Sequence, residues 1–146
     1  MASCGWGVHA MIESAADFVR LRTSEVPGEQ YRAAHDAAAV TVWRAVIEKY
    51  PDMREWVAGN KTVPVEVLEE LSRDPDSRVR VAVAMKRKLP EALQLVLAGD
   101  PDEGVRHRIA CNAKATKRVL QMLADDDQSF VHETAVRRLE ERDFVA

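Results

Sequence analysis

Four cations at a constant spacing are the residues whose types and positions most suggest chemistry. They are Arg54, Arg80, Arg106 and His132, with the same interval between each one and the next. If the chain between them folds into identical units, these side chains line up in what we call the cationic row. Such a row could bind the phosphate backbone of a nucleic acid. The net charge of -3 argues against bulk nucleic-acid binding.

His107 and Cys111 are a second candidate, because a spacing of four places both on one face of a helix. Such a pair could supply two ligands to a metal ion. No third ligand is placed to join them, and Cys111 aligns with Met85, beside the core. The sequence also lacks a glycine-rich phosphate loop and the motifs of serine hydrolases and zinc peptidases. We therefore predict no catalytic residue, no metal and no cofactor.

Composition indicates a soluble globular protein in a reducing compartment. Hydrophobic residues make up 47% of the 146 and charged residues 31%, which excludes a disordered chain. Cys4 and Cys111 cannot build a disulfide framework, which points to the cytoplasm. The apolar runs are too short to span a membrane, and Met1 to Met11 lack the pattern of a secretory signal. We expect residues 1–12 to be a disordered tail.

An internal repeat with the interval of the cationic row sets the architecture. The matching series include Leu71, Leu97, Leu123; Asp74, Asp100, Asp126; Val79, Val105, Val131; and Ala58, Ala84, Ala110. Each copy reads as two short helices, and no stretch alternates like a strand. Neither helix can bury its apolar stripe alone, so neighbouring copies must stack.

Turn residues predict where the helices of each copy begin and end. The first helix is predicted to begin at Asp74-Pro75 or Asp100-Pro101, with the aspartate as its N-cap. Asparagine near its end, as at Asn112, is read as a left-handed terminator. The second helix is predicted to begin at a proline and to bury one face, which in one copy consists of Leu93, Val96 and Leu97.

The register extends to both ends of the chain. Residues 29–37 and 39–49 are predicted to form an earlier helix pair, and residues 51–59 the next first helix. We predict one all-α domain over residues 13–146, a right-handed solenoid of about four two-helix repeats. Its parts are an N-terminal cap (13–27), repeats (28–127) and a C-terminal cap (128–142).

Three segments resemble HEAT-like repeats, most closely the bacterial variant leucine-rich repeat subgroup. They are Trp56 to Pro64, Arg73 to Arg80 and Gly99 to Arg106, and the likeness covers residues 39–140. The resemblance implies an α-solenoid that binds other proteins, in some members as a regulator or an immunity protein. Some members hold an iron–sulfur cluster in a cysteine-rich segment, which this chain lacks. Others are DNA glycosylases.

The same resemblance implies a structural role for the cationic row, as an alternative to phosphate binding. Asp74, Asp100 and Asp126 each precede a member of the row by six residues. HEAT repeats imply that such an Asp/Arg pair bonds between neighbouring copies, and bidentate pairs suit that task. We call the set Asp74, Arg80, Asp100, Arg106, Asp126 and His132 the Asp–Arg ladder. His132 should weaken its link, because imidazole lacks the guanidinium fork.

Turns within the copies carry cations, and turns between the copies carry carboxylates. In a stacked solenoid the cations form one edge, the basic rim, which consists of Lys61, Lys86, Arg87, Lys88, Lys114, Lys117 and Arg118. The rim is either a solubilising surface or a partner site for an acidic protein or a phosphate-bearing ligand. Trp43 is predicted to lie in the core, whereas Trp56 could be exposed and anchor an interface.

Two functions follow as expectations. The first is a non-catalytic protein-binding or scaffold module of the bacterial cytoplasm, with a regulatory, immunity or antitoxin-like role as its narrower form. The alternative is a DNA-binding protein or DNA glycosylase-like enzyme that uses the row Arg54, Arg80 and Arg106. The two differ in whether the arginines are exposed or held by their aspartates.

Overall fold

The computed structural model describes residues 11–145, and this part of the chain is all α-helical. Its ten α-helices are α1 (Ala15–Thr23), α2 (Glu29–His35), α3 (Val40–Lys49), α4 (Arg54–Gly59), α5 (Val65–Leu71), α6 (Ser77–Ala84), α7 (Glu91–Ala98), α8 (Glu103–Cys111), α9 (Lys117–Leu123) and α10 (Ser129–Val145). A 3-10 turn, η1 (Pro51–Met53), precedes α4. The predicted tail at 1–12 lies outside the described residues except for Met11 and Ile12.

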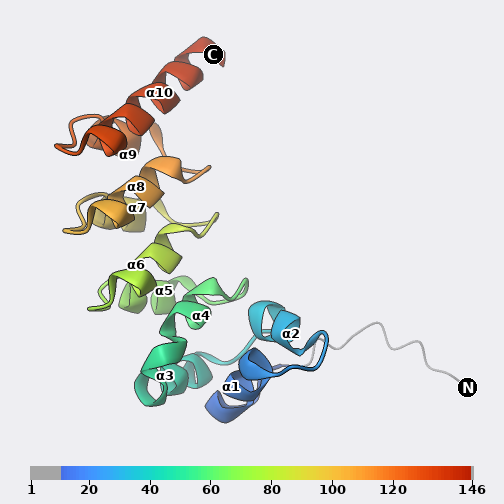
Figure 1. The fold of residues 1–146 in the computed structure, drawn as a ribbon. Helices are drawn as coiled ribbons and strands as arrows, with labels where there is room; N and C mark the ends of the chain where they lie inside the picture. The colour runs from blue at the N-terminus through green and yellow to red at the C-terminus, as the bar shows by residue number, and fades with distance from the viewer. Residues whose placement is uncertain (1–10, 146) are drawn as a thin grey trace, which may run out of the picture. The chain divides into compact units, whose positions relative to one another are not determined.

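The described residues form two compact units, which divide between Leu68 and Glu69. In the first unit, α1 packs against α2 and α3, and α3 packs against η1 and α4 (Figure 1). Trp43 is fully buried in this core, as predicted, with its ring 5.3 Å from that of Phe18 in an edge-on contact. Ile12 is also buried, and its backbone N–H donates to the carbonyl of Ala37.

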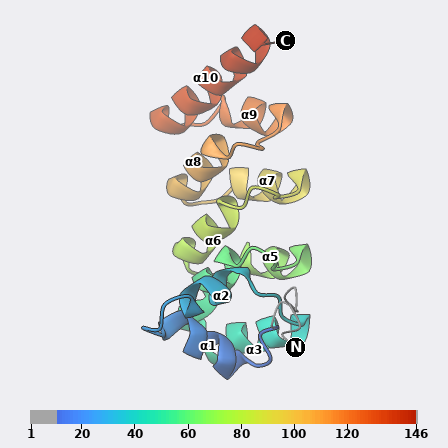
Figure 2. The ribbon, with the colours of Figure 1, turned by 90° about the vertical axis from the view of Figure 1, so that its right-hand side faces the viewer.

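The second unit repeats one helix pair with the period seen in the sequence. The helices α6, α8 and α10 begin at Ser77, Glu103 and Ser129, which are separated by the interval of the cationic row. Each contacts the next, so that α6, α8 and α10 form one row and α7 and α9 form another (Figure 2). The predicted C-terminal cap continues to Val145 as the last helix of the first row.

The aspartate that caps each first helix is not the one predicted. Asp76 and Asp102 are the N-caps of α6 and α8, and their side chains accept from Arg78 N and Gly104 N. The preceding aspartates instead accept from the backbone of these caps, as Asp100 Oδ1 does from Asp102 N at 2.8 Å. The intervening proline has no N–H, so the first aspartate closes a turn and the second caps the helix.

The prediction that a left-handed asparagine ends the first helices is wrong. Asn60 and Asn112 have φ of -64° and -63°. Their side chains bond to the preceding copy instead: Asn112 Nδ2 donates to the carbonyls of Ala84 at 2.9 Å and Lys86 at 2.8 Å. One repeat further along the chain, Arg138 takes the place of the asparagine and donates to the carbonyls of Ala110 and Asn112. This position therefore joins successive copies through main-chain carbonyls.

The buried face of α7 also differs from the prediction. Val96 is 54% exposed, whereas Gln94 is 2% exposed. Gln94 stands where the neighbouring copies have Leu68 and Leu120. Its Nε2 donates to the carbonyls of Leu89 and Lys114, and its Oε1 accepts from Thr116 N. Both N–H donors and the oxygen of this buried amide thus have partners.

Replacing Gln94 with leucine is expected to lower the free energy of unfolding by about 1–3 kcal/mol, although leucine is the residue of the other copies. The change removes the partners of two carbonyls and one N–H that lie in partly or fully buried positions. Urea unfolding followed by circular dichroism measures the difference. A more stable variant would show that water replaces the amide without cost.

Candidate functional site

The arginines of the Asp–Arg ladder are held by carboxylates of the following copy. Arg80 Nε and Nη2 donate to Asp100 at 2.8 and 3.1 Å, and Arg106 Nε and Nη2 donate to Asp126 at 2.8 and 3.3 Å. The arginine side chains are 13% and 14% exposed. Nη1 of Arg80 also donates to the carbonyl of Asp74, and Nη1 of Arg106 donates to the carbonyl of Asp100, both at 2.8 Å. These guanidinium groups are therefore committed to the fold.

The ladder also changes the acid–base behaviour of its members. The hydrogen bond to Asp100 raises the pKa of Arg80, and the bond to Asp126 does the same for the pKa of Arg106. Burial acts to raise the pKa of Asp126, but hydrogen bonds from Arg106 and from the N–H of Gln128 outweigh it and lower that pKa. In the Arg106–Asp126 pair, both pKa shifts favour the charged forms.

The other two members of the cationic row make different contacts. Arg54 donates from Nε to the carbonyl of Ile47 at 2.8 Å. His132 places Nδ1 2.5 Å from the carbonyl oxygen of Ala124, at the end of α9. The four side chains of the row share a place in the repeat but not one set of partners.

The basic rim divides into paired and open cations. Lys117 lies 3.8 Å from Asp143, and Arg118 lies 3.6 Å from Glu91. Lys86 accepts through its carbonyl from Asn112. The other rim cations of the second unit are Arg87, Lys88 and Lys114. All three are exposed, and within residues 11–145 their side chains form no hydrogen bond or ion pair. The open cations thus belong to the loops after α6 and α8.

The remaining predicted partner residues, Lys61 and Trp56, lie in the first unit. Lys61 is exposed, and its backbone N–H donates to the carbonyl of Ala34. Trp56 is 41% exposed, and the guanidinium carbon of Arg22 lies 3.5 Å from its ring centroid. The cation covers one face of the ring, which leaves a smaller apolar surface for a partner than an open indole would.

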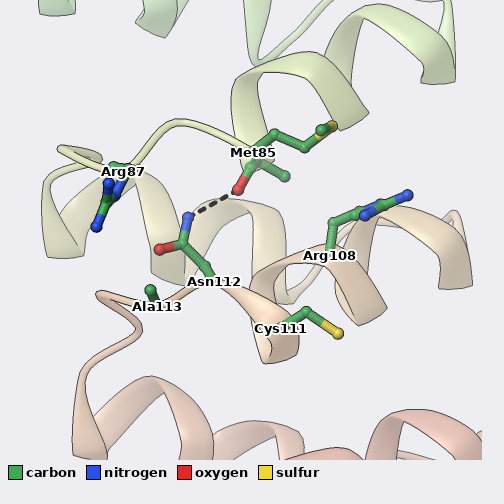
Figure 3. Close-up of a pocket in the computed structure, with 7 residues that line it drawn as sticks. Met85, Arg87, Arg108, Cys111, Asn112 and Ala113 are labelled. Carbon is green, nitrogen blue, oxygen red and sulfur yellow. Dashed lines mark hydrogen bonds between the residues drawn. The ribbon is translucent and has the colours of Figure 1, made fainter.

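A pocket of about 170 Å³ opens beside Arg87 (Figure 3), and the sequence had not predicted it. We call it the α6–α8 pocket; its lining residues are Ala84, Met85, Arg87, Arg108, Cys111, Asn112 and Ala113. None of these residues carries a carboxylate. Arg108 is exposed, and its guanidinium forms no ion pair with any described residue. Two cations without counterions therefore stand at one cavity, an arrangement that favours an anionic ligand.

Cys111 lines this pocket and lies beside His107, but the described residues offer this pair no group of further metal ligands. Cys111 Sγ lies 3.6 Å from His107 Nε2, which in turn lies 3.3 Å from Thr134 Oγ1. The imidazole also meets the ring of Phe130 edge-on at 5.1 Å. Across residues 11–145, no three His, Cys, Asp or Glu side chains gather in a group that could hold a metal ion.

Among the described helices, none is both long and apolar enough to cross a membrane. Compared with protein-family models, with curated proteins and with solved structures, the chain gives no match.

Proposed function

We propose that this chain is a non-catalytic protein-binding module that recognises an acidic segment of a partner protein. The open cations of the rim and the α6–α8 pocket carry this proposal. Arg87, Lys88 and Lys114 project from two neighbouring loops, and Arg108 adds a fourth charge at the pocket. Because the pocket lining has no carboxylate, a glutamate or aspartate side chain entering it would meet cations and no competing anion.

The proposal includes the finer architecture expected from the sequence. Equally spaced helix starts, and bonds from each arginine to the aspartate of the next copy, support HEAT-like repeats of the variant leucine-rich type stacked as an α-solenoid. Such solenoids offer extended surfaces for other macromolecules. The narrower form, a bacterial cytoplasmic regulator or immunity protein, rests on the sequence resemblance.

The geometry favours a protein partner over a nucleic acid. The alternative needed the cationic row to face phosphates, but Arg80 and Arg106 already direct their Nε and Nη1 donors to Asp100, Asp126 and backbone carbonyls. Phosphate binding there would require breaking well-formed charged pairs. The net charge of -3 would oppose it further.

Affinity capture from a nuclease-treated lysate of the source organism tests this function. The wild-type chain is compared with Arg87→Glu and Arg108→Glu, each of which places a carboxylate at the α6–α8 pocket. Arg73→Glu is the matched control, because Arg73 is exposed in the turn between α5 and α6. We expect a stoichiometric protein that survives nuclease, is lost with both pocket variants and is kept by the control.

Two outcomes would contradict the proposal. Enrichment that disappears with nuclease would transfer the function to nucleic acid. A protein captured equally by all four chains would show that the partner does not use the rim or the pocket.

A further inference from the structure

The α6–α8 pocket holds a nucleophile as well as cations. Cys111 is exposed and lines the pocket with Arg108, which lies three residues earlier on α8. Figure 3 shows both side chains extending from α8, with Arg87 on the loop that follows α6. An anionic molecule attracted into this pocket would therefore come to rest beside a thiol.

Hydrogen bonding around His107 places an N–H within reach of that thiol. Thr134 Oγ1 donates its hydrogen to the carbonyl of Phe130 at 2.9 Å, so toward His107 it can only accept. In a hydrogen bond between these two side chains, Nε2 of His107 is therefore the donor, and the same nitrogen lies 3.6 Å from Cys111 Sγ. Once Cys111 has lost its proton, the sulfur competes with Thr134 Oγ1 for this one N–H, which can be shared between them. The thiolate is the form that attacks disulfides.

We propose that the α6–α8 pocket is a modification site, at which Cys111 exchanges with a low-molecular-weight disulfide that carries carboxylates, such as glutathione disulfide. The two arginines attract the carboxylates and hold the disulfide near Sγ. The apolar part of the ligand lies against Met85, Ala84 and Ala113, which also line the pocket. This inference concerns the isolated chain and does not depend on the partner proposed above.

The exchange is balanced without a further oxidant. The Cys111 thiol gives its proton to solvent, and the resulting thiolate attacks one sulfur of the disulfide. A new S–S bond forms at Cys111 while the bond within the disulfide breaks. The leaving thiolate carries away the electron pair and takes up a proton from solvent. The oxidising equivalent comes from the disulfide itself.

Rates of reaction with anionic and neutral disulfides test the site. The full chain is used with Cys4→Ser, so that Cys111 is its one thiol. Ellman's reagent is the anionic probe, 2,2′-dithiodipyridine is the neutral one, and both release absorbing products. Adding Arg87→Gln and Arg108→Gln is expected to slow the anionic probe about three- to tenfold and to leave the neutral probe within about twofold. Arg73→Gln, the matched control, should leave both rates unchanged.

Glutathione disulfide is then added to the same chain and the intact mass is measured. We expect a single adduct that is lost on Cys111→Ser. Equal slowing of both probes by the pocket variants, or an unchanged rate with the anionic probe, would overturn the proposal. A chain that reacts with the neutral probe but forms no glutathione adduct would overturn it as well. Failure of the disulfide exchange would not affect the result of the affinity capture, and failure of the capture would not affect the exchange.

Discussion

Replacing Asp100 with alanine is expected to lower the free energy of unfolding by about 3–5 kcal/mol. Asp100 accepts two hydrogen bonds from Arg80 and one from the N–H of Asp102. Its side chain is 5% exposed and that of Arg80 is 13% exposed. Without the carboxylate, a largely buried guanidinium loses its countercharge and the turn before α8 loses its acceptor. Urea unfolding followed by circular dichroism measures the loss.

A neighbouring aspartate supplies the matched control. Asp102→Ala removes the N-cap of α8 but leaves the Arg80 pair intact, and we expect it to cost about 1 kcal/mol. A double-mutant cycle with Arg80→Ala then isolates the pair, since the two residues are in direct contact. If Asp100→Ala cost no more than Asp102→Ala, the ladder would contribute little to stability.

The second large effect is expected from Asn112→Asp, with a loss of about 3 kcal/mol or more. The change preserves shape but replaces the NH2 group, which donates to the carbonyls of Ala84 and Lys86, with an oxygen. Three oxygens then face one another at a residue that is 7% exposed. The bond from Lys114 N to the other side-chain oxygen can persist. Urea unfolding again provides the measurement.

An exposed amide provides the comparison for this charge change. Gln121→Glu, on the exposed surface of α9, makes the same amide-to-carboxylate replacement and should change stability by less than about 0.5 kcal/mol. Similar small effects in both variants would mean that Asn112 does not join the copies in the way its contacts indicate.

Repetition made the fold readable from the sequence. Recurring apolar residues such as Val79, Val105 and Val131 predicted the first helices, because a spacing that repeats without gaps requires equivalent burial in each copy. Details within the turns were not readable. Asp74 and Asp76 are both good caps by type, and only the backbone path through Pro75 decides which of them caps α6.

Polar residues inside the core escaped prediction for a related reason. Gln94 breaks an apolar series, and a break of this kind normally indicates exposure. Its burial depends on three backbone groups. One carbonyl belongs to its own copy, and the second carbonyl and the N–H belong to the next copy. No local sequence pattern reveals these partners.

The candidate site was predictable only in part. The cations of the rim were visible as a charge pattern, but Lys117 and Arg118 are paired with carboxylates from α10 and α7. Cys111 was considered only as half of a metal pair with His107, and Arg108 was not singled out, because a pocket lined by residues of two different copies leaves no mark in the sequence of either one.

The one-way direction of the ladder has a consequence for the length of the protein. In the second unit each arginine reaches forward to the next aspartate, and each asparagine or arginine at the joining position reaches back by one copy. A tandem duplication of residues 91–116 would leave every one of these bonds with a partner of the same type. The gene can therefore gain or lose a segment of one repeat length in a single recombination event, and each buried polar group of these bonds keeps a partner. A change of any other length breaks the register at once.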